Sequence, residues 1–180
     1  MILGLVQGLT EFLPVSSSGH LMLVKELLGV DGEGFLDFTV AVHFATVLST
    51  IVVFRKVIVD LFKGLFKFKY NDETDYVCKI IVSMIPVAVV GLFFKDKVES
   101  LFGEGVAVVG VCLLVTATLL FLSDFLTSKL KYVNNYRNGI SYWQALVTGI
   151  AQAFAVAPGL SRSGTTIAAG LVSGVKREKM

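Results

Sequence analysis

The sequence predicts an all-α protein: a polytopic membrane helix bundle with two re-entrant helical hairpins related by an inverted repeat. The mean hydropathy is +0.76, and 54% of the residues are hydrophobic. Only 17% are charged, compared with about a quarter in ordinary soluble domains. The charged residues cluster between long apolar segments, and two of these segments contain a polar break. We therefore treat residues 1–180 as a single membrane domain.

The first apolar segment is too short to span a bilayer. Residues 1–13, at about 1.5 Å per helical residue, cannot cross a hydrocarbon core about 30 Å thick. Pro14 then blocks helix continuation, and a turn at residues 16–19 leads to a second apolar piece at 21–24. We expect a re-entrant hairpin whose polar tip lines a pocket, because irregular backbone at that depth must be buried in protein or face water.

Three later segments are long and apolar enough to cross the membrane: residues 35–54, 77–94 and 105–126. Between the first two, residues 57–76 mix apolar and charged side chains. That mixture predicts an interfacial amphipathic helix followed by a polar turn at 71–75.

The last part of the chain repeats the pattern of the first. Residues 139–157 predict a helix that is broken at Pro158-Gly159, and an apolar tail follows at 167–175. An offset of 145 residues places Gly4 on Gly149, Gln7 on Gln152, and Ser16 to Gly19 on Ser161 to Gly164. We predict two repeats, residues 1–56 and 141–180, with opposite membrane orientation. Chance similarity between two turns rich in serine and glycine is the alternative.

The loops predict the orientation of the chain. With three complete spans, loops 55–76 and 127–138 should lie on one side of the membrane and loop 95–104 on the other. The first side carries eight lysine and arginine residues, against three on the second side when Lys25 is included. By the positive-inside rule the first side is cytoplasmic.

The second break carries an arginine among hydroxyl side chains at the expected start of a helix. Backbone N–H groups at a helix N-terminus, the helix dipole and a bidentate Arg162 together suit a phosphate group. A lipid-facing arginine is the alternative, although it is costly at the bilayer centre. The predicted anion-binding residues besides Arg162 are Ser161, Ser163, Gly164, Thr165 and Thr166.

The first break carries a carboxylate, three serines and a histidine. Glu11 lies one helical turn after Gln7, and it could act as a base or as a ligand of a hard cation such as Mg²⁺. A neutral acid hydrogen-bonded within the bundle is the alternative. Ser17 is a candidate nucleophile if Glu11 or His20 takes its proton and Arg162 stabilises the phosphoryl charge. Otherwise, the three serines simply form a turn.

Two further groups of polar residues complete the candidates. Ser16 and Ser18 flank Ser17 and, together with Gln7, are predicted to contact the substrate. Asp37 and His43 lie six residues apart in the first complete span. We expect these two to be interhelical hydrogen-bond partners rather than catalysts.

At these residues the sequence resembles the undecaprenyl-diphosphate phosphatase family of the BacA type. The family is marked by a (Glu/Gln)-x-x-x-Glu element leading into Pro-Val-Ser-Ser-x-Gly-His, and by Pro-Gly-x-Ser-Arg-Ser-x-x-Thr. Here the first element reads Gln7 to Glu11 and then Pro14 to His20, and the second reads Pro158 to Thr166. The resemblance covers essentially the whole chain.

The resemblance implies a bacitracin-resistance enzyme that removes the terminal phosphate of undecaprenyl diphosphate and so recycles the lipid carrier for cell-wall synthesis. It implies a divalent cation, Mg²⁺ or Ca²⁺, linked to Glu11 and Gln7. Ser17 would be the nucleophile and His20 a proton-transfer group. The implied phosphate-binding residues are Arg162, Ser161, Ser163 and Thr166.

The expected partners are a polyprenyl diphosphate lipid and the plasma membrane, with the site opening to the outer face. A net charge of +2 gives no reason to expect nucleic acid, and a homodimer is left open. Gln7 provides an amide where the family also uses glutamate, so this turn supplies one carboxylate. The chain is shorter than the family's usual length, and we expect C-terminal spans after Val175 to be missing.

Two other classes of protein fit the same residues less well. A polyprenyl-phosphate transporter or flippase is the main alternative, because inverted repeats with broken helices are a transporter architecture. A structural membrane subunit would leave the intramembrane Glu11 and Arg162 unexplained.

Overall fold

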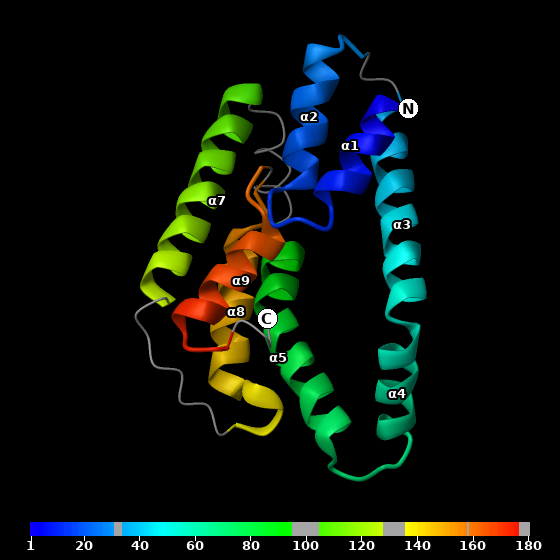
Figure 1. The fold of residues 1–180 in the computed structure, drawn as a ribbon, viewed down its shortest axis with the longest axis vertical. Coiled ribbons are helices and arrows are strands. Elements are labelled where there is room, and N and C mark those ends of the chain that lie inside the picture. Colours follow the sequence, from blue (N-terminus) through cyan, green and yellow to red (C-terminus); the bar gives the residue numbers. More distant parts are fainter. Residues whose placement is uncertain (31–33, 95–104, 128–135, 158, 177–180) are drawn as a thin grey trace.

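The computed structural model describes residues 1–30, 34–94, 105–127, 136–157 and 159–176 (Figure 1). Within these residues every regular element is helical, which confirms the predicted all-α class. The re-entrant and inverted-repeat features stay predictions. The elements are α1 (Ile2–Thr10), α2 (Ser17–Leu27), α3 (Phe35–Val53), α4 (Arg55–Leu65), α5 (Asp72–Phe93), α7 (Val106–Thr127), the 3-10 helix η1 (Arg137–Gly139), α8 (Tyr142–Phe154) and α9 (Arg162–Val172).

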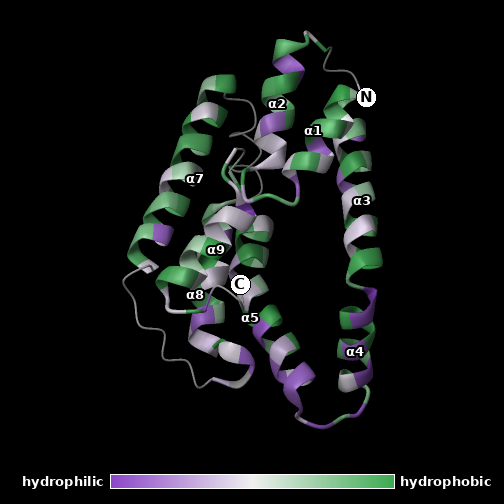
Figure 2. Ribbon diagram, viewed as in Figure 1, coloured by the Kyte–Doolittle hydropathy of each residue, from purple (hydrophilic) through white to green (hydrophobic). Residues whose placement is uncertain are grey.

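The three predicted spans are confirmed as helices that are long and apolar enough to cross a membrane. They are α3 with 19 residues, and α5 and α7 with 22 residues each. Hydrophobic residues dominate these helices along most of their length (Figure 2). Their exposed leucine, valine and phenylalanine side chains suit contact with lipid rather than water.

Helix α5 begins earlier than the sequence pattern predicted. The side chain of Asn71 caps the helix by accepting a hydrogen bond from the Thr74 N–H at 2.8 Å. Its Nδ2 donates to the carbonyl of Gly64 at 2.8 Å, which joins the cap to the end of α4. The predicted polar turn at 71–75 is therefore wrong, since α5 begins at Asp72. The acidic residues that suggested a turn are also favoured in the first turn of a helix.

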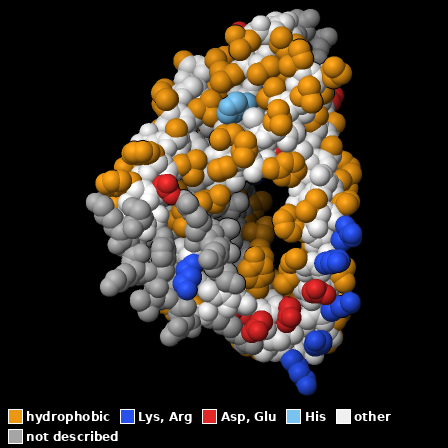
Figure 3. Space-filling view, viewed as in Figure 1, with side chains coloured by type: hydrophobic (Ala, Val, Ile, Leu, Met, Phe, Trp, Pro, Cys, Tyr) orange, Lys and Arg blue, Asp and Glu red, His pale blue; other side chains and the backbone are white. Residues whose placement is uncertain are grey.

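A helix, α4, occupies only the first part of the segment predicted to be amphipathic, since it ends at Leu65. In Figure 1, α4 continues below α3, and Figure 3 shows lysine and arginine side chains over this part of the molecule. Its expected location in the membrane interface stays a prediction.

The bundle is built around α5, α7, α8 and α9. Helix α5 packs along α8, and α9 packs against both α7 and α8. Gly149 permits the first contact, because a Cβ atom at this position would overlap the backbone of Ser83. The hairpin formed by α1 and α2 joins this group through contacts between α2 and α7. Helix α3 has no buried residue.

The α4–α5 connection and η1 lie at the same end of the molecule. Asn138 donates a hydrogen bond to the carbonyl oxygen of Asp72 at 2.8 Å, and Tyr142 donates to Asp75 at 3.1 Å. The turn between α4 and α5 and the approach to α8 are thus on one side, as the count of spans requires.

Candidate active site

Two helix N-termini converge on one polar cavity of about 390 Å³. Helix α2 begins at Ser17 and α9 begins at Arg162, although these residues are 145 positions apart. The N-terminus of a helix carries the positive end of its dipole, which favours an anion. The cavity is lined by Glu11, Leu13, Ser16, Ser17, Ser18, His43, Gln152, Leu160, Ser161, Arg162, Ser163 and Thr166.

Local sequence explains where α9 begins. Ser161 is 2% exposed, and its Oγ accepts a hydrogen bond from the Gly164 N–H at 3.0 Å, which caps the helix. Its own N–H donates to Thr116 Oγ1 on α7 at 3.0 Å. These two bonds fix Ser161, the residue before Arg162, and so fix the backbone at the start of α9.

The start of α2 is held differently. Ser16 has φ +64°, in the left-handed region that residues with a Cβ atom rarely adopt, and its side chain makes no capping bond. Its Oγ instead lies 3.5 Å from Ser18 Oγ. The corresponding pair in the second break, Ser161 and Ser163, is separated by 3.2 Å. Strained backbone of this kind gathers at functional sites.

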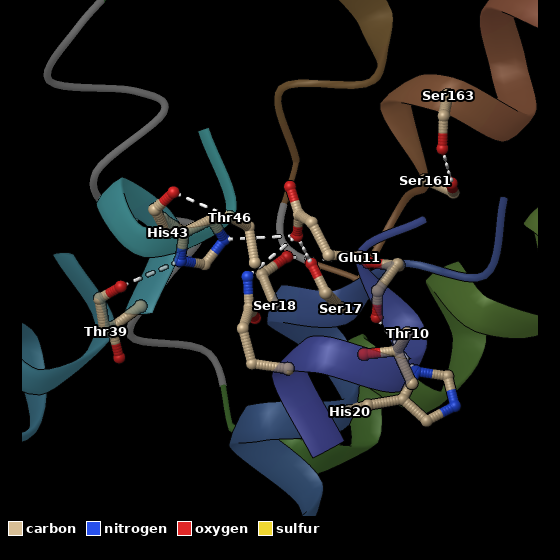
Figure 4. Close-up of polar contacts among 12 residues, drawn as sticks. Thr10, Glu11, Ser17, Ser18, His20, Thr39, His43, Thr46, Ser161 and Ser163 are labelled. Carbon is tan, nitrogen blue, oxygen red and sulfur yellow. Dashed lines mark hydrogen bonds and ion pairs between the residues drawn. The ribbon is translucent and has the colours of Figure 1, made fainter. Parts of the chain in front are cut away.

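Glu11 Oε2 is the centre of the hydrogen-bond network in the first break (Figure 4). It accepts hydrogen bonds from Gln7 Nε2 at 2.9 Å and from Ser17 Oγ. A serine hydroxyl that donates to a carboxylate can pass its proton to it, so the geometry suits an activated nucleophile. The side chain of Glu11 is 30% exposed, on the cavity side.

His43 approaches the same carboxylate from α3. Its Nε2 lies 3.7 Å from Glu11 Oε2, and its Nδ1 lies 2.8 Å from the carbonyl oxygen of Thr39. In Figure 4, Glu11 and Ser17 lie between His43 and the Ser161–Ser163 pair. The cavity thus has a carboxylate and an imidazole toward one end and the start of α9 toward the other.

Most of the predicted site residues meet in this cavity. Glu11, Ser16, Ser17, Ser18, Ser161, Arg162, Ser163 and Thr166 all line it. Gln7 is 1% exposed and reaches the cavity only through Glu11. Gly164 and Thr165 are buried behind the lining, where Gly164 contributes its N–H to the Ser161 cap.

His20 is not brought into the cavity. Its Nδ1 lies 2.9 Å from the carbonyl oxygen of Ser16, and its ring faces a separate, mostly apolar cavity between the first break and α7. Thr165, its equivalent at the 145-residue offset, donates to the carbonyl of Ser161 at 2.8 Å. Both side chains therefore bond to the carbonyl four residues earlier. The proton-transfer role of His20 stays a prediction.

Sequence reasoning missed two cavity residues. His43 was expected to be an interhelical hydrogen-bond partner, but it lines the cavity beside Glu11. The sequence did contain a sign of this role, because His43 is an ionisable residue in an otherwise apolar span and such residues are functional candidates by default. The sequence identifies Gln152 as the repeat equivalent of Gln7 and not as a site residue, but it also lines the cavity.

The oxygen atoms near Glu11 fit a divalent cation that keeps water ligands. Gln7 Oε1 is buried and has no hydrogen-bond partner, which leaves a carbonyl-type ligand close to the carboxylate. In the part of the chain that the structure describes, no three acidic, histidine or cysteine residues gather as a ligand set. Such a small set suits Mg²⁺, which binds through one or two carboxylates together with substrate phosphates.

The chain is similar to known proteins over its whole length. The family model described as "Bacitracin resistance protein BacA" matches residues 1–180. A protein of Bacteroides thetaiotaomicron named "Undecaprenyl-diphosphatase" is 54% identical over 180 residues, covering 100% of this chain and 66% of the relative. Relatives with the same name come from Bacteroides fragilis, 53% identical over 100% of this chain and 65% of the relative, and Methanococcus vannielii, 42% identical over 99% and 68%.

The chain thus spans about two thirds of the length of these curated relatives, between 65% and 68%. Both polar breaks, with Glu11, Ser17 and Arg162, lie inside the matched region. Since the family model covers every residue of the sequence, the chain belongs to the BacA family of bacitracin resistance proteins.

Proposed function

We propose that the protein hydrolyses undecaprenyl diphosphate to undecaprenyl phosphate and inorganic phosphate, and so recycles the lipid carrier of cell-wall synthesis. One observation carries this proposal: a serine bonded to a carboxylate and an arginine at a helix N-terminus line the same cavity. This arrangement combines a nucleophile, a proton acceptor and an anion site. The name shared by the relatives supports the choice of substrate.

The chain's own residues account for the chemical steps. Ser17 Oγ attacks the terminal phosphorus and transfers its proton to Glu11 Oε2, as the bond from phosphorus to the bridging oxygen breaks. Undecaprenyl phosphate leaves, and Arg162 with the N–H groups of α9 stabilises the charge on the transferred phosphoryl group. Water then attacks the phosphoserine and releases inorganic phosphate, while Glu11 returns its proton to Ser17.

A divalent cation, Mg²⁺ or Ca²⁺, is part of the proposal. Glu11 would hold it together with Gln7 Oε1, the buried oxygen that lacks a partner. When bound, it would neutralise charge on the diphosphate. The small set of protein oxygens favours Mg²⁺ over Ca²⁺, which takes six to eight oxygen ligands.

The test is phosphate release from undecaprenyl or farnesyl diphosphate by the purified protein in detergent. Wild type should release phosphate with Mg²⁺ and stop when EDTA is added. Ser17→Ala and Arg162→Ala should abolish release without loss of fold. Ser49→Ala is the matched control, because Ser49 is an exposed serine of α3 outside the cavity. Turnover by Ser17→Ala near the wild-type rate would show that Ser17 is not the nucleophile.

A transporter or flippase is the alternative function, because broken helices also occur in transporters. The same assay separates the two classes, since a flippase moves the intact lipid and releases no phosphate. The hydrogen bond between Ser17 and Glu11 favours the enzyme, because transport needs no activated hydroxyl.

The orientation of the site in the membrane and the oligomeric state of the protein are also proposals. We expect the cavity to open to the outer face of the plasma membrane, from the positive charge of the opposite loops. Protease or thiol labelling of intact cells at each loop would test this orientation. A homodimer stays a prediction that the mass of the detergent-solubilised protein can test.

A further inference from the structure

We infer that His43 is a nitrogen ligand of the divalent cation in this cavity, so that imidazole and the Glu11 carboxylate bind the ion together. This inference rests on the proposed function, which places a cation beside Glu11. It adds a ligand from a third element, α3, to a site otherwise formed by the two polar breaks.

The hydrogen bond from His43 to Thr39 fixes which ring nitrogen is available. A carbonyl oxygen can only accept, so Nδ1, at 2.8 Å from Thr39 O, carries the hydrogen. In the neutral ring Nε2 then has a free lone pair, and this atom faces the cavity and Glu11. Histidines that bind metals in proteins almost always donate their other N–H to a carbonyl or carboxylate in this way.

The distance between Nε2 and Glu11 Oε2 is somewhat longer than the spacing of two neighbouring ligands of one ion. At 3.7 Å it is too long for a hydrogen bond. Oε2 already accepts hydrogen bonds from Gln7 and Ser17, so it does not need His43 as a donor. With metal–ligand bonds of about 2.0 to 2.2 Å, neighbouring ligands of an octahedral ion lie roughly 3 Å apart. The two atoms would therefore approach each other by about 0.7 Å when the ion binds.

The buried amide of Gln7 supports the same location. Its Nε2 donates to Glu11 Oε2 at 2.9 Å, and this bond holds the unpartnered Oε1 of the same amide close to the carboxylate. Gln7, Glu11 and His43 thus offer an amide oxygen, a carboxylate and an imidazole nitrogen. Phosphate oxygens and water would complete the coordination. An imidazole ligand raises the affinity for first-row transition ions such as Mn²⁺ relative to Mg²⁺ and Ca²⁺.

His20 provides a matched control within the chain. It makes the same local bond, from Nδ1 to a carbonyl four residues earlier, at 2.9 Å. Its cavity is lined by Pro14, Val15, Leu113, Thr116, Ala117 and Leu120, with no carboxylate among them. The chain has two histidines, so His20→Gln leaves His43 as its sole imidazole and His43→Gln leaves only His20.

The experiment is electron paramagnetic resonance with Mn²⁺ as the probe, on protein in detergent without a polyhistidine tag. Pulsed spectra detect imidazole ¹⁴N bound to the ion, and replacement by ¹⁵N-histidine identifies its source. Wild type and His20→Gln should show the imidazole signal, and His43→Gln should lack it. Titration should show affinity for Mn²⁺ reduced about tenfold or more in His43→Gln, comparable to other losses around metal sites, with a smaller loss for Mg²⁺ in competition.

The outcomes separate this inference from the proposed function. No imidazole signal in wild type or in His20→Gln overturns the inference even if phosphate is released. An imidazole signal in His20→Gln supports it even if wild type releases no phosphate, in which case the phosphatase proposal fails alone. Because His20→Gln carries the decisive signal, the test does not depend on the folding of His43→Gln.

Discussion

A Cβ atom added to Gly164 would lie 2.9 Å from the backbone oxygen of Pro14, so the first turn of α9 rests directly on the break between α1 and α2. A Cβ atom on Gly19 would in turn lie 3.0 Å from the Cα of Gly159. The 145-residue offset exchanges these pairs, since it places Gly19 on Gly164 and Pro14 on Gly159. A twofold relation between the hairpins would produce such reciprocal contacts, which is consistent with the predicted inverted repeat.

Gly164→Ala should destabilise the protein, because the added methyl group must displace backbone rather than a flexible side chain. We expect a cost of about 1 to 3 kcal/mol, typical of overpacking, and a lower midpoint of thermal unfolding in detergent. Gly8→Ala is the control, since nothing lies within 4 Å of a Cβ there. Equal stability of the two variants would argue against close packing of the breaks.

Arg162→Lys should keep the positive charge but lose bidentate contact with phosphate. Loss of one charge-assisted hydrogen bond, about 1.5 to 3 kcal/mol, corresponds to a roughly ten- to hundredfold lower rate of phosphate release. Arg55→Lys, at the junction of α3 and α4 and outside the cavity, should behave as wild type. Full activity in Arg162→Lys would show that Arg162 contributes only its positive charge and that bidentate contact is not needed.

Thr116→Val should weaken the connection between α7 and the second break. Thr116 is 3% exposed, and its Oγ1 accepts the Ser161 N–H at 3.0 Å, so valine would leave that buried N–H unpaired. The expected cost is about 1 to 3 kcal/mol, measured as loss of thermal stability by size-exclusion chromatography after heating. Thr118→Val is the control on the same helix, because the Thr118 hydroxyl is exposed and donates within the helix to Leu114 O, at 2.8 Å. Indistinguishable melting of the two valine variants would contradict this account.

Lys79→Met should be strongly destabilising, because it removes the cation from a buried ion pair at the polar end of α5. Lys79 Nζ lies 2.5 Å from Asp75 Oδ2, and the two residues are 5% and 2% exposed. An unpaired buried charge costs about 3 to 5 kcal/mol. Thermal unfolding should show this loss, with partial recovery in Lys79→Met/Asp75→Asn.

The exposed Lys63 on α4 supplies the comparison for this pair. Lys63→Met should melt within a few degrees of wild type, since surface substitutions rarely change stability by more than about 0.5 kcal/mol. If Lys79→Met were as stable as Lys63→Met, the ion pair would not be what holds the start of α5 beside Tyr142.

The sequence alone determined which segments form helices, and it placed both ends of α3 and α7 to within about one residue, because these features depend on local chemistry. Apolar length predicted the spans α3, α5 and α7, and the two breaks were marked by Pro14 and by Gly159. The start of α5 was misplaced, since acidic residues suit both a polar turn and a first helical turn. The motifs also identified Glu11, Ser17 and Arg162 as candidates.

Only the tertiary structure decided which histidine faces the carboxylate. His20 and His43 make the same bond to the carbonyl four residues earlier, so local sequence does not distinguish them. The difference arises because α3 packs beside α1 and presents His43 to Glu11, while α2 packs on α7 and turns His20 away from the cavity. Contacts between elements far apart in sequence set these directions, just as they bring Ser17 and Arg162 to one cavity.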